Sequence, residues 1–378
     1  MPTVNSHDNQ PTNPIVQAII EPDTDDRSME DIVLAVARFS ALGDVVMTVP
    51  VVYSLCHNYP RLRVVMVTRP SLTRVFVNPP TNLTVAGVDV DGKYKGIQGL
   101  RQLSRDLIAD YGITDYVDIH DVLRSKTLGM LLRLRGVHVT TMVKDRRGRR
   151  ELTRRQGKVM VPQMGARARY RLTLERAGFK VTRCFEGLYD GHARADLSKV
   201  ESILGPLKNG PLIGIAPFAA HPGKIYPPDK MLAVIDHLIN NTYAHIYLFG
   251  GGKHEEEVFS NWSRRYPDRI TSVAGRRLGL DGELSLINHL DVMLAMDSGN
   301  MHLAAIAGTR TLSIWGATHP YCGFVAWRHH PDDIIQVTMP CRPCSTFGDK
   351  PCYRGDMACM NSITPELVAS RVMSAIAK

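Results

Sequence analysis

Several stretches of the sequence place polar residues directly beside a buried-looking run, where they could contact a ligand. ARFSALGDVVMTVP puts Asp44 just ahead of an apolar run, and AMDSGNMHL puts Asp297, Ser298, Gly299 and Asn300 at the start of a helix. A carboxylate in such a place can take a proton from a hydroxyl. Free backbone N–H groups at a helix start bind anions such as a diphosphate. Ordinary helix capping is the alternative for each stretch.

Two loops and a histidine extend this set. Lys224 lies in the Pro- and Gly-containing loop PFAAHPGKIYPPDK, where its charge could neutralise a phosphate. GGGKHEEEVF offers Glu255 or Glu256 for the hydroxyls of a ribose. His302 falls in the first turn of the helix that follows Asn300. From the residues alone, a solvated loop lysine, an acidic helix start and a packed histidine remain open alternatives.

Strands and helices that would position these residues alternate from Asp31 onward. DIVLAVARF and LRVVMVTRP are typical of buried strands, and we expect helices over GDVVMTVPVVYSLCHNY and PSLTRVFVN. The alternation stops at the basic stretch KDRRGRRELTRRQGK, expected to be a loop, and restarts at PLIGIAPFA after a loop-like region near residues 187–210. The pattern predicts an α/β protein of two Rossmann-like, doubly wound halves that face a central cleft.

The chain of 378 residues is too long for one ordinary core, so two domains are expected. We predict a flexible polar tail over residues 1–30, a first half over 31–195 and a second half over 210–360. The remaining residues, 361–378, are expected to form a helix that packs back across both halves.

Composition narrows the class of protein. The 44% apolar and 22% charged fractions are those of a soluble globular protein, and no run reaches the roughly 20 apolar residues that cross a bilayer. Without a signal peptide, seven cysteines predict reduced thiols and a cytoplasmic location. The net charge of +9 predicts a polyanionic partner. Nucleic acid is not expected, because the basic stretch carries no interleaved aromatic residues for base stacking.

Taken together, SALGDVVMTVP, PFAAHPGKIYPPDK and MDSGNMHLAAIAGTRTLSIWGATHP resemble the hallmarks of glycosyltransferase family 9, the ADP-heptose:lipopolysaccharide heptosyltransferases. The motifs come in the family's order, and the resemblance covers most of residues 31–376. It implies the GT-B fold and the inverting, metal-independent transfer of heptose from ADP-heptose to a lipopolysaccharide inner core.

The resemblance also implies roles for individual residues. Asp44 would be the general base, and Lys224 would steady the diphosphate of the donor. Further donor contacts would come from Glu255 at the ribose and from Asp297, Ser298, Gly299, Asn300 and His302. The chain departs from the family at Ala219, Ala220 and His221, where a Thr or Ser often precedes the lysine, so fewer hydroxyls would meet the diphosphate.

Under this resemblance the basic stretch has a candidate partner, a phosphorylated lipid or glycan acceptor at an anionic membrane surface. The predicted acceptor contacts are Arg124, Arg146, Arg147, Arg149 and Arg150. A solvated surface loop is the alternative. Two further functions stay open: the same chemistry with another nucleotide sugar or glycan acceptor, and a catalytically silent nucleotide-binding protein.

Cysteines gather in CRPCSTFGDKPCYRGDMAC near the C-terminus. Cys341, Cys344, Cys352 and Cys359 are compatible with a structural four-thiolate zinc site. Free thiols are the alternative. No cofactor is expected to be required, since the nucleotide sugar is a substrate.

Overall fold

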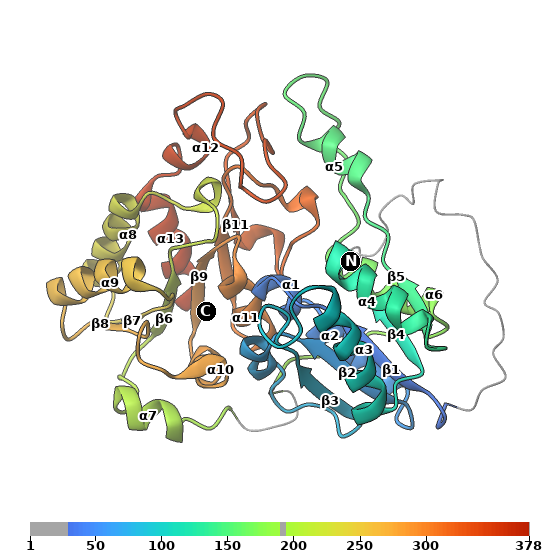
Figure 1. Ribbon diagram of the computed structural model, residues 1–378. Coiled ribbons are helices and arrows are strands. Elements are labelled where there is room, and N and C mark those ends of the chain that lie inside the picture. The colour runs from blue at the N-terminus through green and yellow to red at the C-terminus, as the bar shows by residue number, and fades with distance from the viewer. Residues whose placement is uncertain (1–28, 190–193, 378) are drawn as a thin grey trace, which may run out of the picture.

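The computed structural model describes residues 29–189 and 194–377, and these form two α/β halves that lie side by side (Figure 1). The predicted tail, apart from residues 29 and 30, lies outside the described residues. Strands of the first half are β1 Val33–Ala37, β2 Arg63–Thr68, β3 Leu83–Gly87, β4 Asp115–Asp118 and β5 His138–Thr141. Its helices are α1 Leu42–Val46, α2 Val49–Asn58, α3 Gly96–Tyr111, α4 Leu123–Arg133, α5 Arg146–Leu152 and α6 Ala166–Arg176.

The second half repeats this alternation. Its strands are β6 Leu212–Ala216, β7 His245–Leu248, β8 Ile270–Ser272, β9 Val292–Met296, β10 Thr311–Ile314 and β11 Ile334–Ile335. Its helices are α7 Ser198–Leu204, α8 Pro228–Asn241, α9 Lys253–Arg265, α10 Gly279–Asn288, α11 Gly299–Ile306, α12 Ala358–Asn361 and α13 Pro365–Ile376. Short 3₁₀ segments are η2 Pro70–Val75, η3 Pro222–Lys224, η4 Pro320–Cys322 and η5 Pro331–Asp333.

Both sheets have the same strand order. The first runs β3-β2-β1-β4-β5 and the second runs β8-β7-β6-β9-β10-β11, and the paired strands are parallel. In each half the order reverses beside the first strand, between β1 and β4 and between β6 and β9. Ligands of such sheets bind outside the carboxyl ends of the strands at this switch point. The prediction of two Rossmann-like halves is therefore confirmed.

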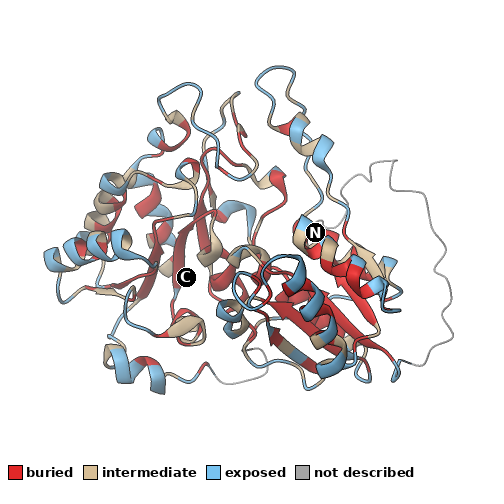
Figure 2. Cartoon of the chain, viewed as in Figure 1, coloured by how far each residue is buried: buried red, intermediate tan, exposed pale blue. Residues whose placement is uncertain are grey.

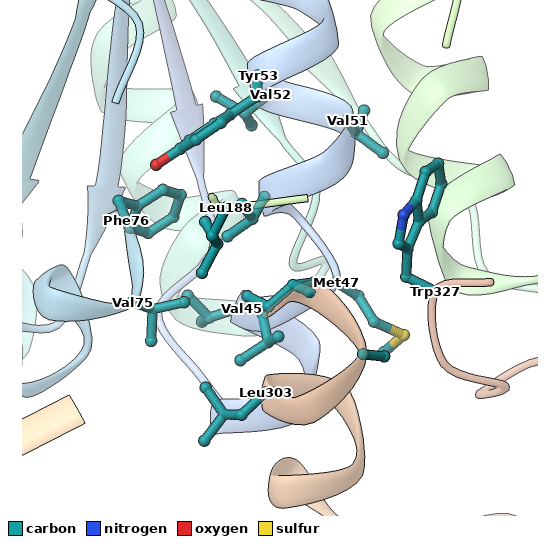
Figure 3. Packing of buried hydrophobic residues seen from close by; sticks show 14 of the residues in the cluster. Val45, Met47, Val51, Val52, Tyr53, Val75, Phe76, Leu188, Leu303 and Trp327 are labelled. Carbon is teal, nitrogen blue, oxygen red and sulfur yellow. The ribbon is translucent and has the colours of Figure 1, made fainter. Parts of the chain in front are cut away.

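Most residues of both sheets are buried, and buried residues continue across the junction between the halves (Figure 2). One apolar cluster joins residues of α1 and α2 with residues of α10 and α11. In Figure 3, Val45 and Met47 of the first half lie beside Leu303 of the second. This shared core fixes how the two halves meet at the carboxyl ends of their strands.

Several predicted elements differ from the structure. The helix expected over PSLTRVFVN is only the 3₁₀ segment η2, because Asn78 has a positive φ of 48° and two prolines follow it. The helix expected over residues 43–59 is split into α1 and α2, with Pro50 in the first turn of α2.

Two regions expected to be loops contain helices. In the basic stretch, α5 begins where the Asp145 side chain accepts a hydrogen bond from the Gly148 N–H, and it buries Leu152. In the region between the halves, α7 forms with Val200 buried on its inner face. The first helix was not predicted because its sequence is dominated by charged residues. The second was not predicted because one buried residue is too few to give a helical spacing of apolar residues.

The C-terminal helix does not pack across both halves as expected. Val368, Ala369 and Val372 of α13 belong to the core of the second half, together with residues of α8. The Tyr226 hydroxyl also donates to the Ile363 carbonyl at 2.8 Å, just before α13. Thus α13 completes the second half. Among the described residues, no helix is long and apolar enough to cross a membrane.

Candidate functional site

On the first half, Asp44 pairs with a residue that the sequence analysis did not select. Its Oδ2 atom lies 2.5 Å from Nη2 of Arg38, which directly follows β1. Two carbonyls fix the guanidinium: Arg38 donates to Ser40 at 2.8 Å and to Ile119 at 3.0 Å. The Asp44 side chain is 25% exposed and the Arg38 side chain 8%. The carboxylate is thus held at the carboxyl edge of the sheet while it remains open to a ligand.

On the second half, the structure brings Lys224 and Asp297 together. Lys224 Nζ, at the end of η3, lies 2.9 Å from Asp297 Oδ2, at the end of β9. The Thr318 hydroxyl donates to the same carboxylate oxygen at 2.8 Å. Asp297 is buried, whereas the lysine is partly exposed. The predicted phosphate-binding lysine is therefore oriented by an acid of the same edge.

The first turn of α11 is pressed against α1 of the first half. A Cβ added at Gly43 would lie 2.9 Å from Cδ2 of His302, and one added at Gly299 would lie 2.8 Å from Cδ2 of Leu42. Only glycine at both positions allows the two helices to approach this closely. The helix that carries Asp44 and the helix that follows Asp297 therefore begin at the same junction.

Two buried polar atoms in this turn have no hydrogen-bond partner within the part of the chain that the structure describes. They are the Ser298 hydroxyl oxygen and His302 Nδ1. Ser298 occupies the N-cap position of α11, yet its side chain makes no capping hydrogen bond. Burial, reinforced by Arg167 and Lys224, holds the pKa of His302 well below its usual range, so the ring is neutral. An unsatisfied hydroxyl at a helix N-terminus is free to meet an anionic ligand.

Glu255 rather than Glu256 faces the loop after β7. Its carboxylate accepts a hydrogen bond from the Gly251 N–H at 2.8 Å and lies against Gly250, while Glu256 lies against Gly275. Burial raises the pKa of Glu255. The side chain is thus fixed at the carboxyl end of β7, where the predicted ribose contact requires it.

The five predicted acceptor arginines do not form one cluster. Arg124 pairs with Asp91 at 3.0 Å, Arg147 pairs with Glu151 at 3.0 Å, Arg146 reaches only to 3.9 Å from Asp121, and Arg150 is exposed. Arg149 differs from these four. Its guanidinium lies 5.6 Å from the centre of the Phe324 ring and 5.8 Å from that of Phe347, both in the second half.

Charge interactions connect the acid of the first half with the lysine of the second. Burial lowers the pKa of Arg149, and the Asp44 carboxylate opposes this effect. Burial raises the pKa of Cys322 to about 11, with Asp297 also raising it and Lys224 and Arg149 lowering it. Arg149 is thus subject to the charge of Asp44 in the first half and itself acts on Cys322 in the second half.

The sequence analysis missed His120 and three cations on the acceptor side, Arg38, Arg69 and Lys144. His120, 8% exposed, follows β4, and the charges of Arg38, Lys144, Arg69 and Arg124 act on it. Burial, together with these charges, lowers its pKa to about 3. Arg38 and Arg69 directly follow β1 and β2, which is the signal that could have found these two residues. Asp91 pairs with Arg69 at 2.8 Å and with Arg124 at 3.0 Å, and Asp44 pairs with Arg38, so this edge of the first sheet carries charges of both signs.

A cavity opens on the first half near the basic stretch. It has a volume of about 740 Å³ between α4, β5 and α5, and Asp44 and Lys224 are absent from its walls. Its lining comprises Asp121, Lys126, Met130, Arg133, Val139, Thr141, Met142, Val143, Lys144, Asp145, Arg146 and Arg147. Apolar and charged side chains both line the cavity, and most of the charged ones are cations.

Among the residues it describes, the structure does not show the four-thiolate zinc site with which the cysteine-rich segment was compatible. Across residues 29–189 and 194–377, no three His, Cys, Asp or Glu side chains gather closely enough to hold a metal ion. Cys341, Cys344, Cys352 and Cys359 are free thiols.

Comparisons with known proteins agree with this architecture. Residues 170–350 match the family model described as glycosyltransferase family 9 (heptosyltransferase). Lipooligosaccharide heptosyltransferase 2 of Campylobacter jejuni is 26% identical over 133 residues, which are 34% of this chain and 40% of that protein. The match therefore spans about two fifths of that relative's length.

Two solved structures share the fold over nearly the whole chain. A glycosyltransferase family 9 protein of Veillonella parvula superposes with a TM-score of 0.69 at 17% identity, covering 93% of this chain and 99% of that one. The heptosyltransferase WaaC of E. coli, solved with ADP, superposes with a TM-score of 0.62 at 15% identity, covering 91% and 100%. The fold is thus GT-B-like, and residues 170–350 of this chain are similar to glycosyltransferase family 9.

Proposed function

We propose that this protein is an inverting glycosyltransferase that moves heptose from ADP-heptose to an acidic, lipopolysaccharide inner-core-type acceptor. The observation that supports the proposal is the close contact between α1, which carries Asp44, and α11, which begins just after Asp297 of the Lys224–Asp297 pair. The similarity of residues 170–350 to glycosyltransferase family 9 supports the reaction class, and the ADP held by the similar WaaC structure supports the choice of nucleotide.

The second half would bind the donor. As the sugar–phosphate bond breaks, negative charge grows on the departing diphosphate. Lys224 is partly exposed and oriented by Asp297, so its ammonium can neutralise that charge. The N–H groups and the unpartnered hydroxyl at Ser298 supply further hydrogen bonds. Glu255, at the end of β7, would accept hydrogen bonds from the ribose hydroxyls.

The first half would bind and activate the acceptor. Asp44, held by Arg38, would take the proton of the attacking hydroxyl as the new glycosidic bond forms. The cations around His120 would attract phosphate or carboxylate groups of the acceptor. Such an acceptor is anchored in a bilayer, so we place the reaction at the cytoplasmic face of an anionic membrane.

A ligand panel followed by a transfer assay tests this function. ADP, UDP, GDP and CMP are compared by thermal shift, and a ligand at 100 times its dissociation constant adds about 2.7 kcal/mol of stability. A shift with ADP alone, followed by transfer from ADP-heptose, is the expected result. A shift with UDP or GDP instead would point to another donor. A shift with none of them would leave a protein that does not bind a nucleotide sugar.

A further inference from the structure

The first part of the cysteine-rich segment, residues 341–349, packs on two loops that carry the donor site. Arg342 is 3% exposed, and its guanidinium donates to the Gly316 carbonyl at 2.6 Å and to the Thr318 carbonyl at 3.0 Å. The Cys344 N–H donates to the Ala317 carbonyl at 3.0 Å. This segment, which the proposed reaction does not use directly, therefore fixes the loop that follows β10.

The same segment touches Lys224 itself. A Cβ added at Gly348 would lie 2.7 Å from Cγ of Lys224 and 3.4 Å from its Cδ, so the aliphatic stem of the lysine crosses the glycine. The Gly348 carbonyl accepts a hydrogen bond from the Gly223 N–H at 3.1 Å. A Ser345 hydroxyl that accepts from the Gly348 N–H at 2.9 Å holds the turn in place. The segment is thus in contact with the backbone and the side chain of the lysine loop.

A second route leads from Arg342 to the lysine ammonium. Arg342 binds the Thr318 carbonyl, the Thr318 hydroxyl donates to Asp297, and Asp297 pairs with Lys224 at 2.9 Å. One route holds the stem of Lys224 and the other holds its charged end. A lysine otherwise carries four flexible bonds and loses rotamer freedom when it binds an anion.

We propose that residues 341–349 form a bracket that presets Lys224 for a diphosphate, with Gly348 and Arg342 as positioning residues. The proposal rests on the function above in taking the ligand of Lys224 to be the diphosphate of a nucleotide sugar. It assigns the cysteine-rich segment to donor recognition through its backbone and Arg342, without any role for the thiols.

The sequence offers a matched pair of glycines for the test. Both glycines lie in the cysteine-rich stretch, Gly348 inside the bracket and Gly355 beyond it. Their φ angles are 78° and 80°, so alanine meets the same backbone penalty at each position. At Gly355 an added Cβ meets nothing within 4 Å, whereas at Gly348 it meets Lys224. We expect Gly348→Ala to weaken the binding of inorganic pyrophosphate and of ADP by about tenfold or more, which is the effect of a mispositioned binding group. Gly355→Ala should leave the binding of both ligands unchanged.

Steady-state kinetics supply a readout that a general structural defect would not mimic. Gly348→Ala should raise the KM for ADP-heptose and leave the KM for the acceptor unchanged. Thr318→Val keeps the shape of the side chain but removes the hydroxyl that is bonded to Asp297, so it should also weaken the binding of pyrophosphate. Equal losses in Gly348→Ala and Gly355→Ala, or no loss in Gly348→Ala, would overturn the bracket.

Pyrophosphate separates this proposal from the proposed function. If pyrophosphate binding follows the expected pattern while ADP-heptose is not turned over, the bracket stands and the transferase assignment fails. If the wild-type protein turns over ADP-heptose and Gly348→Ala matches it, the bracket fails and the function stands. If the wild-type protein binds no pyrophosphate, Lys224 is not a diphosphate site and the bracket is rejected.

Discussion

Arg38 and Asp44 form a 2.5 Å ion pair across the turn that joins β1 to α1. Because Arg38 is also bonded to the carbonyls of Ser40 and Ile119, it has little freedom to follow the carboxylate if that group moves. The pair therefore sets where Asp44 points. It gives the first half a charged group in a fixed position at the junction of the halves.

Asp44→Asn tests whether that carboxylate is the general base. The amide keeps the shape of the side chain but cannot accept the proton of the acceptor hydroxyl, so transfer should fall by about 10²–10⁴-fold. Binding of ADP, measured by thermal shift, should stay unchanged, because the donor contacts come from the second half. Near-normal turnover by this variant would remove Asp44 from the base role.

Lys224→Met tests the pair on the other half. It should abolish ADP binding and also leave Asp297 buried without its cation, which typically costs about 3–5 kcal/mol of unfolding free energy. The double variant Lys224→Met/Asp297→Asn should recover part of that stability without recovering ADP binding. Urea unfolding and titration with ADP separate the two effects. A double variant that binds ADP normally would contradict the role of the lysine.

The alternation of strands and helices predicted where the candidate site residues lie in the fold. Asp297 directly follows β9, and Asp44, Lys224 and Glu255 lie in the segments that follow β1, β6 and β7. The pairing of Arg38 with Asp44 depends on the path of a short turn, which periodicity does not specify.

Contacts between segments far apart in the chain could not be predicted from the sequence, for a different reason. Arg149 stacks on Phe324 and Phe347 only because α5 rises from the first half toward the second (Figure 1). Similarly, the spacing of four cysteines suggested zinc, whereas among the described residues no three metal-binding side chains gather closely enough to hold an ion. Spacing along a chain does not contain this information.

Gly43→Ala tests the close approach of α1 and α11. Alanine favours a helix by about 1 kcal/mol over glycine, so an uncrowded site would gain stability. Here the new methyl would lie 2.9 Å from the His302 ring, and the forced shift should cost about 1–3 kcal/mol. We expect lower stability in urea and slower transfer. Gly251→Ala, whose Cβ meets nothing within 4 Å, is the control, and equal behaviour of the two variants would show that the junction is not tightly packed.

Buried histidines predict a loss of stability in mild acid. Burial lowers the pKa of His120 to about 3 and those of His245 and His319 to about 4, while an unfolded histidine has a pKa of about 6.5. Between these values the unfolded chain binds protons that the folded chain does not. The free energy of unfolding therefore falls as the pH drops below about 6.5, by up to about 1.4 kcal/mol per pH unit for each histidine.

His245→Gln isolates one of these contributions. His245 lies in β7, where its Nε2 is 2.8 Å from the Thr271 hydroxyl, which glutamine can still reach as a hydrogen-bonding group. Urea unfolding between pH 6.5 and pH 5 should show a pH slope smaller by about one proton than that of the wild-type protein. Replacement of the exposed His57 by Gln should leave the slope unchanged. If His245→Gln keeps the full wild-type slope, His245 must become protonated in the folded protein, and its burial does not destabilise the charged ring.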